Sequence, residues 1–174
     1  MFDHTIRDFR ISDAASVASL NDQARIDGYC ESGFVILPLG EEQICAEATA
    51  SEVTYLIYEA DGLPVAFLKY SSRAFEEYQE PVWFDGPVDT SRGLHIEKIV
   101  VERGHRGMGI GRALYTQLVK RSAGRTLFTY VTVSPCENRA SVRFHEALDF
   151  QSAALVPYRL PDGSWFREAL YVRR

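Results

Sequence analysis

The stretch VERGHRGMGIGRALYTQL (residues 101–118) joins an apolar, strand-like run to a helix-like one. Gly107, Gly109 and Gly111 occupy every second position and are surrounded by arginines. A helix start leaves about four backbone N–H groups unpaired, and its dipole places partial positive charge there. Glycine also lets the backbone approach a ligand closely. The stretch therefore predicts an anion site suited to a phosphate-bearing ligand.

The segments around this loop read as strand, loop, helix, strand and helix. LHIEKIVV (94–101) is the first strand, and a helix follows from Gly109 to Ser122 with Gly124 as its stop. RTLFTYVTV (125–133) is the next strand. A second helix then runs from Asn138 to Leu148, led in by Pro135 and capped by Asn138.

The rest of the chain adds strands at both ends. HTIRDFRI (4–11) reads as an opening strand, and Ser12 or Asp13 then caps a helix to about Asp27. EEQICAEATA (41–50) is a second helix. Strand pairs follow at 53–59 with 64–70 and at 152–160 with 164–174, and 71–94 reads as irregular. This order predicts a mixed α/β domain over residues 1–174, with a hairpin at each end of the sheet.

Composition narrows the class of protein. A chain of 174 residues fits one domain that buries roughly 70% of its unfolded surface. The three cysteines have unrelated spacings, which disfavours a disulfide scaffold or structural zinc and favours a reducing compartment. The N-terminus lacks the apolar core of a signal peptide, and no apolar run approaches the ~20 residues of a membrane span. We therefore expect a cytoplasmic protein without a membrane partner.

Charge is unevenly distributed along the chain. The net charge of −5 argues against general nucleic-acid binding. Residues 101–125 nevertheless hold six basic side chains against the single acid Glu102, so a local charge of +5 surrounds the glycine loop. This local charge strengthens the prediction of an anionic ligand.

Two common nucleotide loops fit the glycines poorly. A P-loop requires Lys-Ser/Thr after its last glycine, but Arg112 and Ala113 follow Gly111. A dinucleotide fingerprint requires Gly-x-Gly-x-x-Gly near the chain start and an acid about twenty residues on, where this chain has Leu127 and Phe128 in a strand. Such a redox protein would bind NAD tightly.

A third alternative is a resemblance. Arg106-x-x-Gly109-x-Gly111 after IEKIVV resembles the acetyl-CoA pyrophosphate loop of the GNAT superfamily of N-acetyltransferases. NRASVRFHEALDF (138–150) resembles a later helix of that family. The resemblance is close over about 94–150 and extends to the remainder by element order. It departs from the family at His145, where Tyr is frequent, and at Asp149, where Gly is frequent. Asp149 predicts a helix end at which a non-glycine residue is left-handed.

The resemblance implies a fold and an activity. The fold is α/β (α+β), with a central mixed and mostly antiparallel twisted sheet of about seven strands flanked by about four helices. The activity is acetyl transfer from acetyl-CoA to a primary amine by direct attack in a ternary complex, without a metal. A small-molecule acceptor such as an amino acid or polyamine is favoured over a peptide. A homodimer is one alternative for the oligomeric state. A non-catalytic acyl-CoA-binding or regulatory module is the alternative function.

Cofactor-binding residues follow from the resemblance. The backbone of Ile99, Val100 and Val101 pairs with the pantetheine arm, and Arg112 or Arg103 reaches outer phosphates. Asn138 contacts the pantetheine arm, caps its helix, or does both. The pyrophosphate is held by the amides of Arg106, Gly107, Met108, Gly109, Ile110, Gly111 and Arg112.

The chemistry requires a base for the ammonium and an acid for the CoA thiolate. The resemblance implies that Glu97 is the general base, acting directly or through a water, because enzymes of this family often take their base from these strand positions. His95 shares the strand face of Glu97 and is the expected second base or relay. The resemblance implies that His145 is the acid, because it stands where the family frequently has Tyr, and an imidazole titrates near neutral pH. His145 is expected to lie beside the apolar stripe of its helix. The alternatives are a solvent-facing Glu97 and a histidine without a role. Cys136 reads as a small buried hydrophobe rather than a nucleophile.

The acceptor is expected to bind between the first helices and the 71–94 connection, which combines acidic and aromatic side chains. Tyr29, Tyr78, Trp83 and Glu97 are the candidate substrate contacts. An ordinary solvated loop with aromatics tucked under it is the alternative.

Overall fold

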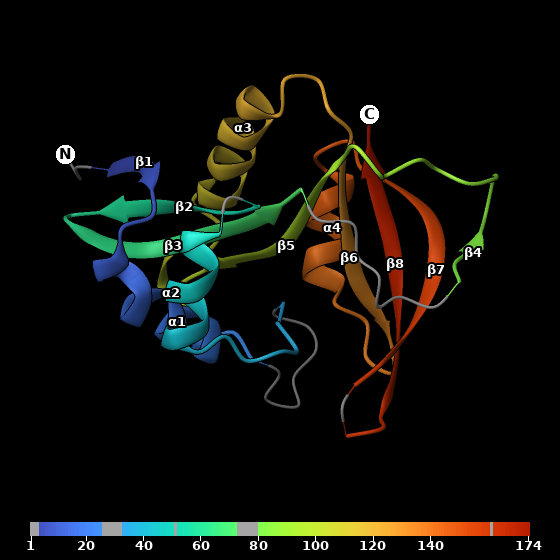
Figure 1. The fold of residues 1–174 in the computed structure, drawn as a ribbon, viewed down its shortest axis with the longest axis horizontal. Helices are drawn as coiled ribbons and strands as arrows, with labels where there is room; N and C mark the ends of the chain where they lie inside the picture. The colour runs from blue at the N-terminus through green and yellow to red at the C-terminus, as the bar shows by residue number, and fades with distance from the viewer. Residues whose placement is uncertain (1–3, 26–32, 51, 73–79, 161) are drawn as a thin grey trace.

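The computed structural model describes residues 4–25, 33–50, 52–72, 80–160 and 162–174, and these contain one eight-stranded sheet (Figure 1). The order across the sheet is β1-β2-β3-β5-β6-β8-β7-β4. Every neighbouring pair is antiparallel except β5 and β6, so the predicted mixed and mostly antiparallel sheet is confirmed. The strands are β1 (His4–Asp8), β2 (Val53–Ala60), β3 (Leu63–Ser71), β4 (Val82–Trp83), β5 (Leu94–Val101), β6 (Leu127–Ser134), β7 (Gln151–Arg159) and β8 (Trp165–Arg173).

One strand was not predicted. β4 has two residues and pairs with β7 inside the connection that reads as irregular. A two-residue strand is too short to display the alternation on which a strand prediction depends. The expectation of a hairpin at each end of the sheet is wrong, because β1 lies outside the β2–β3 hairpin and β4 lies outside the β7–β8 hairpin.

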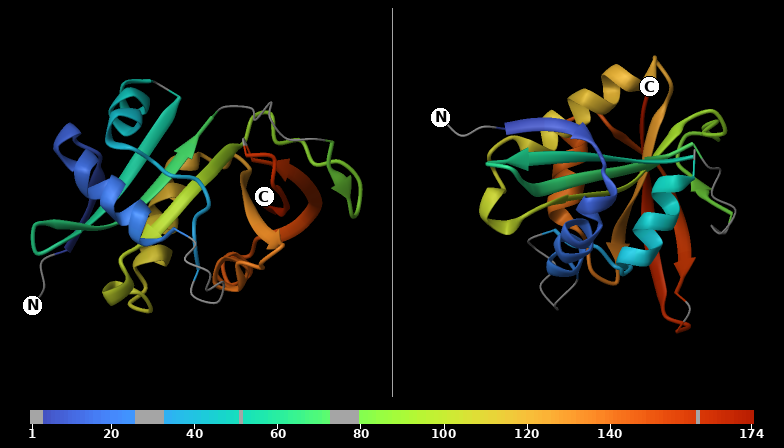
Figure 2. Two further views of the ribbon diagram at one scale, coloured as in Figure 1. Left: turned by 90° about the horizontal axis from the view of Figure 1, so that it is seen from below. Right: turned by 60° about the vertical axis from the view of Figure 1, so that its left-hand side comes forward.

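Helices cover both faces of the sheet (Figure 2). α1 (Ala14–Gln23) and α2 (Glu41–Thr49) pack with Val100 and Phe67 in one buried cluster. α3 (Ile110–Ser122) and α4 (Arg139–Glu146) pack against the opposite face. The predicted four helices are therefore present, and none of the described helices is long and apolar enough to cross a membrane.

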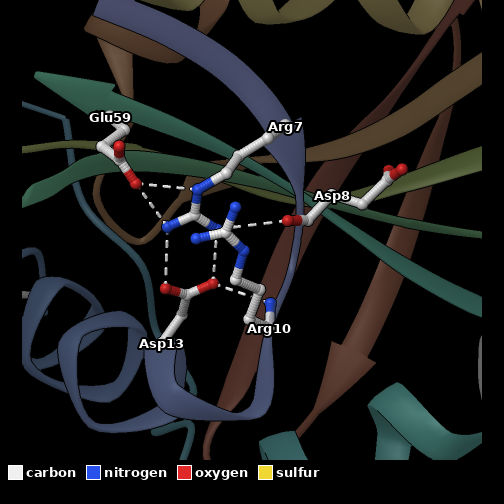
Figure 3. Close-up of polar contacts among 5 residues, drawn as sticks. All are labelled: Arg7, Asp8, Arg10, Asp13 and Glu59. Carbon is white, nitrogen blue, oxygen red and sulfur yellow. Dashed lines mark hydrogen bonds and ion pairs between the residues drawn. The ribbon is translucent and has the colours of Figure 1, made fainter. Parts of the chain in front are cut away.

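The start of the first helix differs from its prediction. Asp13 makes no side-chain cap to α1, because its carboxylate accepts two hydrogen bonds from Arg7, at 2.7 and 2.9 Å (Figure 3). The same carboxylate accepts the backbone N–H of Arg10 at 2.7 Å, and the Arg7 Nε donates to Glu59 at 2.8 Å. These contacts tie β1, the 3-10 helix η1 (Ile11–Asp13) and β2 together. α1 ends at Gln23, four residues short of the predicted end.

The later helix ends follow the sequence more closely. Asn138 caps α4 by accepting the amide of Ser141 at 3.2 Å, as predicted. Asp149 has φ 64°, which confirms the predicted left-handed residue after this helix. After α3 the left-handed turn begins at Ala123, with φ 51°, one residue before the expected Gly124.

Candidate functional site

The two parallel strands at the centre of the sheet separate after a short pairing. β5 and β6 each have eight residues but pair only at Leu94 with Leu127 and His95 with Phe128. Figure 1 shows the two strands running in different directions beyond this point. Thr129 Oγ1 donates to the carbonyl of Ile96 at 2.8 Å where they part. On its other side β5 stays paired with β3 through Val101. The β6-facing edge of residues 99–101 is therefore not covered by β6, and an extended ligand can pair with it.

A cavity of about 590 Å³ lies beside this gap. Of the predicted site residues, it brings together Glu97, His95, Ile99, Asn138 and His145. The 34–38 segment closes one side of the cavity. Its remaining walls include Gln43, Glu47, Lys69, Lys98, Thr129, Tyr130, Thr132, Ser141, Tyr158 and Glu168.

A bulge in β5 determines which side chains enter the cavity. Lys69 pairs with Lys98 and Tyr70 pairs with Ile96, so Glu97 is one extra residue on β5. A bulge of this kind interrupts the strict alternation of a strand. Glu97 and Lys98 consequently line the same cavity although they are adjacent in sequence.

Glu97 belongs to a charged cluster under the cavity. The Lys69 ammonium lies 2.6 Å from Glu97 Oε2 and 2.8 Å from Glu47 Oε2, and Lys69 is only 4% exposed. The Tyr55 hydroxyl donates to the same Glu47 oxygen at 2.5 Å. The Glu97 side chain is 14% exposed, so the predicted base is neither a solvent-facing strand residue nor sealed in the core. This contact fixes the orientation of its carboxylate.

Lys98 is the second lysine of the cavity. Its ammonium donates to the carbonyl of Leu37 at 3.1 Å. Burial, followed by the positive charge of Lys69, lowers the pKa of Lys98 to about 8, although the charges of Glu97, Glu47 and Glu168 oppose the shift. The cavity therefore holds a partly buried amine that changes charge just above neutral pH.

His95 is a core imidazole at the edge of the cavity. Its ring stacks on Phe128 at 5.1 Å between centroids and meets the edge of Tyr130. Burial, followed by the charge of Lys69, lowers the pKa of His95 to about 3. A group with this pKa holds a proton too weakly to serve as an efficient base near neutral pH. The predicted second-base role gains no support from this geometry.

His145 is enclosed rather than placed beside the apolar face of α4, because only 2% of it is exposed. Nδ1 lies 2.7 Å from the Ser141 carbonyl, which can only accept, so Nδ1 carries the proton. Nε2 then accepts from the Tyr115 hydroxyl at 2.5 Å. Burial lowers the pKa of His145 to about 4, although the Ser141 carbonyl favours the charged form. Both ring nitrogens are thus engaged within the protein.

The glycine loop leads from the end of β5 into α3. Gly107 and Gly109 have φ 78° and 81°, a left-handed backbone that glycine adopts without strain. Because α3 begins at Ile110, its first amides have no acceptor within the helix. The start of α3 lies beside the uncovered β5 edge, since a Cβ added at Gly111 would come within 3.6 Å of Ile99 Cδ1. Loop and edge therefore form one continuous surface for a phosphate with an extended arm.

The arginines of the loop have different partners. Arg106 Nε donates to the Val101 carbonyl at 3.0 Å and so braces the turn. Burial, followed by the charge of Arg103, lowers the pKa of Arg106. Arg112 donates to the Ala147 carbonyl at 3.3 Å at the end of α4. Arg112 therefore already links two helices, and it needs to turn to reach a phosphate.

Asn138 does more than cap its helix. Its Nδ2 donates to the Phe34 carbonyl at 2.8 Å, and the side chain is buried. Asn21 Nδ2 donates to the Leu37 carbonyl at 3.3 Å. α1 and α4 thus hold the 34–38 segment over the cavity from both sides.

The predicted substrate contacts have mixed outcomes. Trp83 packs in a cluster around Phe128 and Val172 at the β4 side of the sheet, and it does not line the cavity. Tyr29 and Tyr78 lie outside the described residues.

Cys136 is partly exposed and disulfide-bonded, so the expectation of a small buried hydrophobe is wrong, whereas Cys45 carries a free thiol.

Several cavity residues were missed by the sequence analysis. Lys69 interrupts the apolar run VAFLKY (65–70), and a lysine in a buried strand is a signal that could have been followed. Glu47 and Glu168 carry no such signal, because each sits in an ordinary mixed segment. Within the described ranges no group of three or more His, Cys, Asp or Glu side chains is arranged to hold a metal ion.

Residues 20–150 match the family model of the acetyltransferase (GNAT) family. No curated protein matches the chain in sequence.

Three solved structures illustrate the similarity in fold. The yncA protein of Salmonella typhimurium with its cofactor acetyl-CoA is 19% identical, covering 98% of this chain and 93% of that one, at a TM-score of 0.69. An N-acetyltransferase from Staphylococcus aureus Mu50 is 20% identical, covering 98% of both, at 0.70. Arabidopsis thaliana NAA60 in complex with acetyl-CoA is 16% identical, covering 98% of this chain and 99% of that one, at 0.68.

Proposed function

Since this chain belongs to the acetyltransferase (GNAT) family and uses acetyl-CoA, we propose that it acetylates a primary amine of a small molecule. The transfer is direct, within a ternary complex of enzyme, acetyl-CoA and acceptor. The observation that carries the proposal is the juxtaposition of Glu97 with the uncovered edge of β5.

The cofactor arm lies along that edge. The backbone of residues 99–101 pairs with the pantetheine amides as an added strand would, because β6 has diverged there. The amides from Arg106 to Arg112 hold the pyrophosphate, helped by the helix dipole. This arrangement brings the thioester toward Glu97 on the same strand. Asn138 contacts the arm while it keeps its bond to Phe34.

The reaction moves one acetyl group and releases one proton. The acceptor ammonium gives a proton to the Glu97 carboxylate, directly or through a water, and the neutral amine attacks the thioester carbonyl. The C–S bond breaks as the C–N bond forms, and the nitrogen then loses its second proton. The CoA thiolate takes up one proton, and the proton held by Glu97 is released to solvent. Lys69 keeps the Glu97 carboxylate aimed into the cavity.

His145 has a different role in this proposal from the one its sequence position predicts. Its Nε2 accepts from Tyr115 and its Nδ1 donates to Ser141, so neither nitrogen is available to the thiolate. We assign it the positioning of α4 against α3, and the thiolate takes its proton from water or a cavity tyrosine, Tyr130 or Tyr158.

The test is the variant Glu97→Gln, measured by free thiol release from acetyl-CoA across a panel of amino acids, polyamines, aminoglycosides and peptides. We expect kcat/KM for the best acceptor to fall about 100-fold or more, because general-base catalysis contributes roughly that much. The KM for acetyl-CoA should stay within about twofold. Glu42→Gln, on an exposed position of α2, is the matched control.

Two results would contradict the proposal. Full turnover by Glu97→Gln would remove Glu97 from the mechanism. Stabilisation by acetyl-CoA without thiol release for any amine would instead favour the non-catalytic acyl-CoA-binding module.

A further inference from the structure

Two opposite charges enter the acceptor side of the cavity from adjacent residues. The bulge in β5 directs both Glu97 and Lys98 into the space beside Leu37 and Lys69. A strand with strict alternation would send one of them to the opposite face. The bulge is therefore the reason that Glu97 and Lys98 lie at the same wall of the cavity.

The two lysines of the cavity are bound in different ways. Lys69 forms ion pairs with Glu47 and Glu97 at 2.8 and 2.6 Å, so its charge is compensated. Lys98 hydrogen-bonds only a neutral carbonyl, that of Leu37, and forms no ion pair with any carboxylate of the described residues. An ammonium has three donors, so two N–H groups of Lys98 stay available to a ligand.

The environment of Lys98 favours an anionic ligand. Placing a cation away from water costs free energy unless an anion accompanies it. Burial lowers the pKa of Lys98 to about 8 although Glu97, Glu47 and Glu168 oppose the shift from a distance, and a carboxylate bound directly beside it would restore the charged form. The position beside the Lys98 ammonium is therefore suited to a carboxylate of a bound ligand.

The phosphates of the cofactor do not reach Lys98 in the proposed arrangement. Lys98 contacts the segment between α1 and α2, while the glycine loop begins the helix on the opposite face, α3. Val100, two residues on, packs with the α1 and α2 cluster, and Ile99 packs with the α3 cluster. Lys98 thus faces the acceptor and not the pyrophosphate.

Resting on the proposed function, we infer that the acceptor is a free amino acid, with its carboxylate bound by Lys98 and its amine directed at Glu97. Glu168 lines the same cavity and offers a second carboxyl group to the ammonium. A polyamine lacks the carboxylate, and a peptide N-terminus lacks a carboxylate next to its amine. Lys98 is therefore the specificity-determining residue.

The experiment compares kcat/KM for an amino acid with kcat/KM for the amine that lacks its carboxylate. Thiol release is recorded for each L-amino acid and for its decarboxylated amine, with wild type, Lys98→Met and Lys98→Arg. We expect the ratio of kcat/KM for the best amino acid over its amine to fall about tenfold or more in Lys98→Met, because a charge-assisted hydrogen bond is lost. Lys98→Arg should keep most of the ratio. Since only the ratio between variants is used, the basicity of each amine cancels.

Controls separate this inference from the proposed function. Lys120→Met, an exposed lysine of α3, should leave the ratio unchanged. Thermal unfolding shows whether each variant is folded, and the KM for acetyl-CoA should stay within about twofold in Lys98→Met.

Four outcomes would overturn the inference. An unchanged ratio in Lys98→Met, or a raised KM for acetyl-CoA alone, would remove Lys98 from acceptor binding. Acetylation of amines or polyamines without any amino acid would overturn the inference and leave the proposed function intact. Acetyl-CoA binding without turnover of any acceptor would overturn both.

Discussion

At the scale of single residues, the cavity depends on Lys69. This lysine is nearly inaccessible and holds two carboxylates, Glu47 from α2 and Glu97 from β5. The contacts join a helix to the centre of the sheet and orient the proposed base. A lysine replaced by a neutral side chain would leave two carboxylates facing each other in a poorly solvated space.

We therefore predict that Lys69→Met lowers the free energy of unfolding by about 3 kcal/mol, because breaking a buried ion pair leaves uncompensated charge. Urea denaturation monitored by circular dichroism measures this change. The double variant Lys69→Met with Glu47→Gln should recover part of the loss, since one carboxylate is then neutral. A loss below about 1 kcal/mol, the range of surface pairs, would contradict the prediction.

At the scale of elements, the site is made by two departures from regular structure. The bulge at Glu97 makes two adjacent side chains, Glu97 and Lys98, point into the same cavity. The loop before α3 changes the direction of the chain at glycines with a left-handed backbone. Gly109 is the residue before the helix, so its conformation sets the direction of the first amides. Cofactor binding is accordingly sensitive to a methyl group at this position.

Gly109→Ala should cost about 1–2 kcal/mol of stability, because an L-residue is strained at φ 81°. We also expect a severalfold increase in the KM for acetyl-CoA as the amides shift. Gly104→Ala is the matched control, since an added Cβ there meets nothing within 4 Å and no left-handed φ is involved. Thermal unfolding and steady-state kinetics test both effects. Equal behaviour of the two variants would contradict the prediction.

At the scale of the whole molecule, the two halves of the sheet are joined through the short pairing of β5 with β6. His95 lies in that pairing, and His145 joins α4 to α3 through Tyr115. Burial lowers both imidazole pKa values, to about 3 and about 4. The junction between the halves is therefore maintained by neutral histidines.

This gives a stability prediction for mild acid. At pH values well above 6.5 both histidines are neutral whether the chain is folded or unfolded. Between about pH 6.5 and 4 the unfolded chain binds protons that the folded chain does not, so stability falls as pH falls, by ~1.4 kcal/mol per pH unit for each histidine. His95→Phe should flatten the pH dependence of urea denaturation by that amount per pH unit. Parallel curves for variant and wild type would contradict the prediction.

The sequence alone determined the element order, the α3 and α4 boundaries within a few residues, and the glycine loop. These depend on local patterns: periodicity, helix caps and glycine at positive φ. The cap of α4 by Asn138 was also predicted correctly, because a capping residue stands directly before its helix in the sequence. The short β4 and the end of α1 were not found, since long-range pairing of β4 with β7 and of Arg25 with Val35 decides them.

Only the tertiary structure decided the chemistry around Glu97. The bulge, the divergence of β5 from β6, and the meeting of Lys69 with Glu47 arise from contacts between elements distant in sequence. The same holds for His145, whose helix pattern indicates partial exposure but whose imidazole is enclosed by Tyr115 and Ser141. Local periodicity records which face of an element is apolar. It does not record which polar groups the opposite element brings to that face.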